Sequence, residues 1–172
     1  MSRQNLIPIT IVITWLIGCA AIFWWFEYRY WGAYDKQLIQ FDTQAILELY
    51  PILKQDTGNQ PLVVHFKDDE CPCERYRLAH LSGMKTDLQG VRQVTLSQLD
   101  QRLAQISIPA SPAVAIWDHH GVLAYFGPYS SGMTCGQGFD FIKIVLDKLS
   151  QNENPQWVNN QGFGCFCQWK EV

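Results

Sequence analysis

The motif Cys71-Pro72-Cys73 contains the residues best suited to chemistry in this sequence. It follows an apolar run, Leu62 to Phe66, and opens a stretch with a helical pattern. Two thiols are therefore expected at a strand-to-helix junction. There, the exposed N–H groups and the positive end of the helix favour a thiolate over a thiol. Thiolates attack disulfides and bind soft metal ions. The motif therefore predicts thiol chemistry.

Two features of the motif oppose a simple redox pair. Residues two positions apart in a helix point in different directions, so a Cys71–Cys73 disulfide would close a small, strained ring. Negative neighbours disfavour a thiolate and so act against the helix terminus. Four acidic residues surround the cysteines: Asp68, Asp69, Glu70 and Glu74. The sequence leaves this balance open.

Three further cysteines lie towards the C-terminus. Cys135 precedes the last expected helix, and Cys165 and Cys167 form a second Cys-x-Cys pair in the tail. The 16 residues from Leu149 to Cys165 reach up to roughly 50 Å when extended. A structural disulfide between Cys135 and Cys165 or Cys167 is therefore one expectation. Because the cysteines beyond Cys19 are odd in number, one of them should stay free, bind metal or bond elsewhere.

An uncharged segment of 21 residues, Leu6 to Phe26, precedes the domain. As a helix it would span roughly 30 Å, which is the thickness of a membrane core. Aromatic residues typical of a membrane interface crowd its C-terminal end: Trp24, Trp25, Tyr28, Tyr30, Trp31 and Tyr34. We predict an uncleaved single-pass anchor. The alternative is a lipoprotein signal, Leu16-Ile17-Gly18-Cys19, with Cys19 as the lipidated N-terminus.

The predicted location is the bacterial inner membrane, with the C-terminal domain in the periplasm. Arg3, Arg29 and Lys36 leave the positive-inside rule undecided, so cysteine usage decides, because paired cysteines fit an oxidising compartment. The formal net charge of −3 excludes nucleic acid as a partner.

Hydrophobic periodicity predicts a domain with alternating strands and helices. Strands are expected at 37–41, 62–66, 91–95, 113–117 and 122–126, and helices at 43–54, 73–88, 97–106 and 139–149. Early alternation implies parallel crossovers, and the hairpin around Asp118-His119-His120-Gly121 adds an antiparallel edge. The fold class is therefore α/β with a mixed central sheet. We divide the chain into an anchor (1–34), this domain (35–150) and a cysteine-containing tail (151–172) that packs on the domain.

Over roughly Gln37 to Leu149, the chain resembles the thioredoxin-like superfamily. Phe66-Lys67-Asp68-Asp69-Glu70-Cys71 falls where thioredoxins run from the central strand into their Cys-x-x-Cys helix. Pro112, in Ser111-Pro112-Ala113-Val114, falls where the family places a cis-proline against the active thiols. The resemblance implies a three-layer sandwich. The chain departs from the family by having one residue between its cysteines and Glu70 in place of the usual Trp.

Three functions follow from these observations. The first is a thiol–disulfide oxidoreductase that acts on protein thiols or disulfides and needs no cofactor. Its site residues are Cys71, Cys73 and Pro112, with Cys71 as nucleophile, Cys73 or Cys135 as resolving residue, and Pro112 shaping the peptide-binding edge. The second is Cu(I) handling, which is described in the next paragraph, and the third is a scaffold in which the disulfides are only structural.

The second function is Cu(I) handling. Soft thiolates suit this ion, and Gly164-Cys165-Phe166-Cys167 resembles the Cys-Phe-Cys element of cytochrome oxidase copper-assembly factors. The candidate copper ligands are Cys71, Cys73, Cys135, Cys165 and Cys167. Histidine is not expected among the ligands, because His65, His80, His119 and His120 lack partners at metal-ligand spacing.

Overall fold

The computed structural model describes residues 3–26, 28–36, 43–54, 60–104, 106–132 and 139–169, and it separates into two compact units, Met1–Trp31 and Gly32–Val172. The first unit contains α1 (Arg3–Phe26) and the short helix η1 (Tyr28–Tyr30). Its segment Ile7–Tyr30 is long and apolar enough to cross a membrane, and none of that segment is buried. A signal sequence has the same properties.

The second unit is a mixed α/β domain around a five-stranded sheet in the order β3-β2-β5-β6-β9. Its strands are β2 (Leu62–Lys67), β3 (Arg92–Ser97), β5 (Ala113–Trp117), β6 (Leu123–Gly127) and β9 (Trp157–Val158). The β2–β3 and β6–β9 pairs are parallel, and the β2–β5 and β5–β6 pairs are antiparallel. The predicted mixed sheet with a late hairpin is confirmed. The expected strand at 37–41 lies outside the described residues.

Strand β2 lies inside the sheet, where the sequence placed it. Its residues from Leu62 to Phe66 are all buried, which is typical of a strand covered on both faces. Phe66 lies opposite Leu96 on β3 and Ala113 on β5. The chain therefore leaves this strand from a position fixed on both sides, directly before the cysteine motif.

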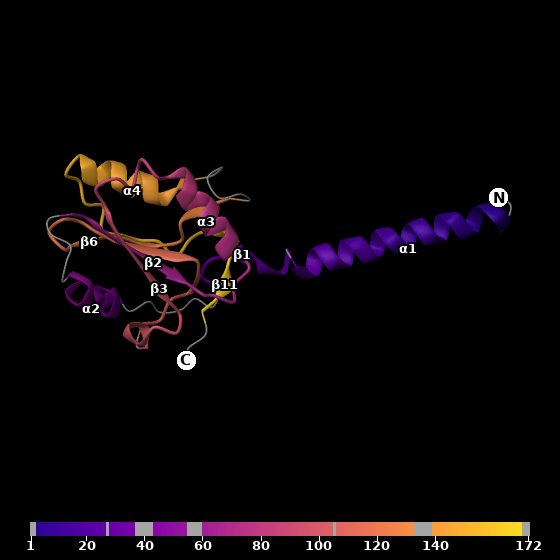
Figure 1. Cartoon of the computed structure of the whole chain (residues 1–172), viewed down its shortest axis with the longest axis horizontal. Helices are drawn as coiled ribbons and strands as arrows, with labels where there is room; N and C mark the ends of the chain where they lie inside the picture. The colour runs from indigo at the N-terminus through magenta and orange to yellow at the C-terminus, as the bar shows by residue number, and fades with distance from the viewer. Residues whose placement is uncertain are drawn as a thin grey trace. The chain divides into compact units, whose positions relative to one another are not determined.

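Helices cover both faces of the sheet (Figure 1). On one face, α2 (Thr43–Leu53) buries Ile46, Leu49 and Leu53 at helical spacing and contains Pro51. On the other face lie α3 (Glu74–Gly83) and α4 (Phe141–Ser150). Each face has its own cluster of buried apolar side chains.

Two predicted helices differ from the structure. The helix expected from Cys73 to Leu88 ends at Gly83, and turns replace its last part. Met84 is the C-cap, and its N–H donates a hydrogen bond to Leu81 O (3.1 Å), which closes the last turn. The helix expected at 97–106 is only a 3₁₀ turn, η3 (Gln101–Leu103). Strand β3 extends through Ser97, and the side chain of Asp100 caps the turn by accepting a hydrogen bond from Arg102 N.

Short strands connect the tail to the domain. β11 (Cys167–Gln168) pairs antiparallel with β4 (Ala110–Ser111), and Cys167 lies opposite Ser111. β10 (Phe163–Cys165) precedes it, and β7 (Ser130–Ser131) pairs with β8 (Phe139–Asp140). The remaining strand is β1 (Trp31–Ala33). The tail thus adds a strand beside the segment that carries Pro112.

Candidate functional site

The cysteine motif forms the connection between β2 and α3, as the sequence predicted. Cys71 N donates a hydrogen bond to Asp68 O (3.1 Å), and Glu74 N donates one to Cys71 O (3.1 Å), so consecutive turns fix the motif. Cys73 is the N-cap of α3 but makes no side-chain capping hydrogen bond. Cys71 is 5% exposed and Cys73 is fully buried. Both side chains therefore belong to the interior of the site.

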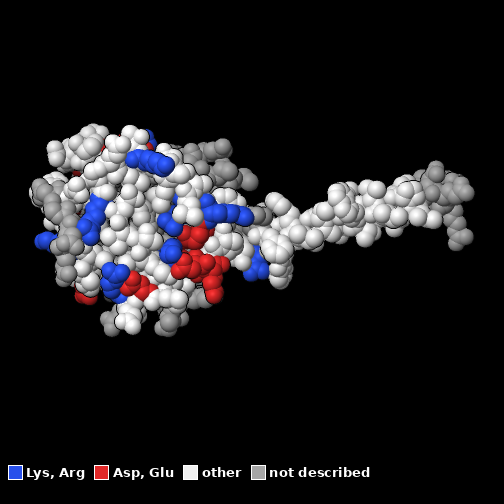
Figure 2. Space-filling view, in the orientation of Figure 1, with Lys and Arg blue, Asp and Glu red and all other residues white. Residues whose placement is uncertain are grey.

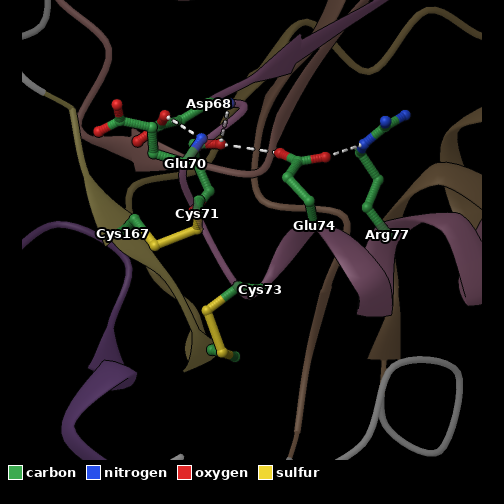
Figure 3. The surroundings of a disulfide bond; sticks show 9 residues. Asp68, Glu70, Cys71, Cys73, Glu74, Arg77 and Cys167 are labelled. Carbon is green, nitrogen blue, oxygen red and sulfur yellow. Dashed lines mark hydrogen bonds and ion pairs between the residues drawn. A yellow bond between two sulfur atoms is a disulfide. The ribbon is translucent and has the colours of Figure 1, made fainter. Parts of the chain in front are cut away.

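Two disulfides join the motif to the tail (Figure 3). Cys71 bonds to Cys167, and Cys73 bonds to Cys165, with Cα–Cα distances of 5.9 and 5.5 Å. The expected disulfide between Cys135 and a tail cysteine is therefore wrong, because both tail cysteines have other partners. Cys135 lies outside the described residues. Cys19 is free and exposed.

The pairing of β11 with β4 explains this connectivity. It places Cys167 opposite Ser111, and the Sγ atom of Cys71 lies 3.8 Å from Ser111 O. The bond between Ser111 and Pro112 is cis, as the resemblance led us to expect. Cys71, Cys167 and the cis-proline segment therefore meet at one point. The Sγ atoms of Cys71, Cys73 and Cys167 all lie within 4.8 Å of one another.

Apolar side chains hold the tail independently of the disulfides. Phe166 and Trp169 are buried in the same cluster as α2, and the ring of Phe166 packs edge-on against Tyr34 at a centroid distance of 5.3 Å. Trp169 N donates a hydrogen bond to Pro109 O (3.3 Å), and Tyr34 N donates one to Gly162 O (2.8 Å). Cys165 and Cys167, by contrast, are partly exposed. As whole residues the tail cysteines are thus less completely buried than the motif cysteines, although Cys167 shares a buried sulfur cluster with Cys71 and Cys73.

A polar network leads from the motif into α3. Ser111 Oγ accepts a hydrogen bond from Asp68 N (2.9 Å) and donates one to Glu74 Oε1 (3.0 Å). The other oxygen of Glu74 accepts a hydrogen bond from the buried guanidinium of Arg77 (Figure 3). Asp68 also accepts a hydrogen bond from Glu70 N through its side chain (2.9 Å). Ser111, the residue before the cis-proline, is therefore linked by hydrogen bonds to a partly buried ion pair.

The acidic residues around the motif are not four equivalent charges. Glu74 pairs with Arg77, and Asp69 pairs with Lys67 and accepts a hydrogen bond from Ser97 (2.7 Å). The hydrogen bond from Lys67, followed by that from Ser97, lowers the pKa of the Asp69 carboxyl. Basic side chains accompany the acidic ones on the face shown in Figure 2. Much of the expected repulsion of a thiolate is thereby compensated.

Two histidines lie in the interior and contact Tyr129. His65 Nδ1 is 2.6 Å from the Tyr129 hydroxyl oxygen, and burial lowers the pKa of His65 to about 4. His80 packs against the same ring, and its Nε2 atom lies 3.4 Å from a carboxylate oxygen of Asp140. Among the described residues, the cluster of possible metal ligands contains cysteines and no histidine. His119 and His120 lie in the hairpin turn, where His120 is exposed.

Sequence reasoning missed the partners of the motif cysteines and the network from Ser111 to Arg77. One signal was present for the disulfides. The two cysteine pairs have identical spacing, 71 and 73 against 165 and 167. Two such pairs can form two disulfides in antiparallel order, with the first cysteine bonded to the last and the second to the third. No comparable pattern marks Ser111 or Glu74 in the sequence.

The match to a family model covers the domain and leaves out α1. The family model described as a domain of unknown function (DUF6436) matches residues 38–169, which include all four bonded cysteines. No curated protein matches the chain. A crystal structure of a hypothetical protein from Sinorhizobium meliloti 1021 is similar, with 16% identity, a TM-score of 0.49, and coverage of 70% of this chain and 84% of that one. An uncharacterized conserved protein from Geobacillus kaustophilus has 17% identity, a TM-score of 0.48, and coverage of 70% and 82%.

Proposed function

The chain belongs to the DUF6436 family, and we propose that its domain is a thiol–disulfide oxidoreductase with a thioredoxin-like fold. One observation carries this proposal. Cys71 lies at the junction of β2 and α3, with its sulfur 3.8 Å from the carbonyl oxygen before cis-Pro112 and already bonded to the cysteine of an added strand. This arrangement is what a redox protein would have when a peptide cysteine is bound to its nucleophile.

The reaction begins from the reduced motif. The Cys71 thiolate attacks one sulfur of a substrate disulfide, forms a mixed disulfide and expels the other sulfur as a thiolate. Cys73 then attacks Cys71 Sγ, which releases the second substrate sulfur and leaves a Cys71–Cys73 disulfide. The distance of no more than 4.8 Å between these sulfur atoms supports this second step. The slight exposure of Cys71, against none for Cys73, supports Cys71 as the nucleophile.

The substrates we propose are protein thiols or disulfides, bound as an extended segment that takes the place of β11 beside β4 and Pro112 once the disulfides to the tail are reduced. The pairing of β11 with β4 supports this, because it demonstrates that the edge accepts an antiparallel strand. We further propose that α1 anchors the protein in the bacterial inner membrane, with the domain in the periplasm. The apolar character of α1 and the disulfides, which persist in oxidising compartments, support this location. A lipid-carrying form that begins at Cys19 would instead establish the lipoprotein alternative.

Reduction of a disulfide-containing peptide by the pre-reduced, full-length protein in detergent tests the proposal. Cys71→Ser should abolish turnover. Cys73→Ser combined with Cys167→Ser should accumulate a mixed disulfide between Cys71 and the peptide, because both neighbouring thiols that could resolve it are then absent. Cys19→Ser is the matched control, because Cys19 lies outside the domain and is unbonded; it should react like the unmodified protein. Full activity of Cys71→Ser would refute the proposal.

Copper handling is a second candidate, favoured by the convergence of three sulfur atoms. Once both disulfides are reduced, Cys71, Cys73 and Cys167 would offer soft ligands suited to Cu(I). Titration of the reduced protein with Cu(I) should then give one tightly bound ion, and Cys167→Ser should weaken binding. A protein that neither reduces the peptide nor binds copper would fit the third function, in which the two disulfides only stabilise the tail.

A further inference from the structure

We propose that the two disulfides form an internal relay, in which the tail cysteines exchange electrons with an outside dithiol and pass them to the motif. Addition of two electrons and two protons converts the Cys71–Cys167 and Cys73–Cys165 bonds into one Cys71–Cys73 disulfide and two tail thiols. This inference rests on the proposed function, since it describes how the same site is loaded. It assigns a redox role to Cys165 and Cys167.

Exposure determines where an outside thiol can attack. The motif cysteines and the sulfur cluster that they form with Cys167 are buried, whereas Cys165 lies outside that cluster and is partly exposed, which makes it the more accessible of the two tail cysteines. A thiolate of an outside dithiol therefore attacks a tail sulfur and expels a motif thiolate. Attack at Cys165 expels the Cys73 thiolate, and attack at Cys167 expels the Cys71 thiolate.

Both routes lead to the same product, because the motif sulfurs lie within 4.8 Å of each other. A Cys73 thiolate attacks Cys71 Sγ and expels the Cys167 thiolate. A Cys71 thiolate attacks Cys73 Sγ and expels the Cys165 thiolate. The second thiol of the outside reductant then resolves the remaining mixed disulfide, and the reductant leaves as its own disulfide. One bond between motif cysteines forms, both bonds to the tail break, and two electrons are taken up.

The tail stays in place during the exchange. The buried rings of Phe166 and Trp169 and the hydrogen bond from Trp169 N to Pro109 O do not depend on the disulfides. Burial of these two large aromatic side chains favours the docked tail. The tail thiols therefore remain beside the motif, and the exchange is reversible within one molecule. The site has three redox states, with two, one or no disulfides.

Limited reduction followed by alkylation and tryptic mapping tests the relay. The full-length protein in detergent is treated with increasing dithiothreitol, quenched with iodoacetamide and digested. Trypsin releases the motif as peptide 68–75 and the tail as peptide 149–170. In the untreated protein, two disulfides should join these peptides. In the species reduced by two electrons, peptide 68–75 should be separate, unalkylated and internally oxidised, and peptide 149–170 should carry two alkyl groups.

The opposite outcome is equally distinct. Without exchange, the two peptides would stay joined by one disulfide, with one alkyl group on each, and the relay would be refuted. Direct passage to four alkylated cysteines would refute it as well. In the matched variant Cys73→Ser, the relay predicts that no unalkylated 68–75 peptide forms. A protein that reduces a peptide disulfide but keeps its native connectivity would lose the relay and retain the proposed function. A protein that shows the disulfide exchange but does not reduce the peptide would retain the relay and lose the proposed function.

Discussion

Helices α3 and α4 cover the same face of the sheet (Figure 1) but bury opposite kinds of side chain. α4 buries Phe141, Ile142, Val145 and Leu146, whereas α3 buries Arg77 and His80. The N-cap of α4 is Asp140, whose side chain accepts a hydrogen bond from Lys143 N (3.0 Å). The N-cap of α3 is Cys73, which is disulfide-bonded and whose side chain makes no capping hydrogen bond. We conclude that α4 mainly stabilises the domain and that α3 gives up apolar burial to position the cysteine motif.

The largest effect should come from the apolar side of this comparison. Ile142 is fully buried against the sheet. Ile142→Ala should lower the free energy of unfolding by about 2–5 kcal/mol, because it removes buried methyl groups and leaves a cavity. Urea denaturation of the full-length protein in detergent measures this. Peptide-disulfide reduction well below the unfolding transition should be unchanged.

Ile144→Ala is the control for this prediction. Ile144 lies on the same helix, but 38% of it is exposed. Ile144→Ala should therefore lower the free energy of unfolding by much less than Ile142→Ala. Equal losses for the two variants would contradict the view that α4 acts through its buried face. Loss of peptide reduction in folded Ile142→Ala would contradict the division of roles between α3 and α4.

A pH dependence should mark the polar side of the comparison. His65 packs beside Tyr129, and burial lowers its pKa from the ordinary 6.5 to about 4. The unfolded chain therefore binds more protons between these values, so stability is fully present above pH 6.5 and is lost as the pH falls towards 4. The loss should be on the order of 3 kcal/mol, from 1.36 kcal/mol per pKa unit.

Urea denaturation at a series of pH values, with the disulfides intact, measures this loss. His65→Gln should remove most of the slope between pH 6.5 and 4, because glutamine does not titrate. The matched variant His120→Gln, in the exposed turn of the hairpin, should keep it. The prediction fails if the slope survives in His65→Gln.

The contrast between the helices also explains what the sequence could predict. The amphipathic pattern predicted a helix at 139–149, and α4 runs from Phe141 to Ser150. The apolar run predicted β2, and the glycine turn predicted the hairpin of β5 and β6. The helix expected from Cys73 to Leu88 was too long, because its inward side chains are charged or polar and so gave no apolar stripe that would reveal where it ends.

The site was only half predictable, because its parts come from distant segments. Local spacing placed Cys71 and Cys73 before a helix, but it does not say which strand the tail joins. Four cysteines allow three pairings, and the pairing of β11 with β4 selects one of them. The contact between Ser111 and Glu74 joins residues 37 positions apart and likewise depends on tertiary structure.

The smallest predicted effect on stability, but the most specific one, concerns Glu74. Glu74→Gln keeps one oxygen that can accept from Arg77 and gains an N–H that can donate to Ser111 Oγ, but it removes the charge, so unfolding should become easier by only about 1–2 kcal/mol. In the reduced protein, loss of this negative charge, with Arg77 left uncompensated, favours thiolates and should lower the pKa of the motif thiols. The pH dependence of alkylation of peptide 68–75 measures this shift.

Asp147→Asn, on α4, is the control variant. It removes an exposed carboxylate 3.6 Å from Lys143, so it should change stability by less than about 1 kcal/mol and leave the pKa of the motif thiols unaltered. Identical thiol titrations in the two variants would mean that the partly buried ion pair of Glu74 and Arg77 does not alter the pKa of the motif thiols.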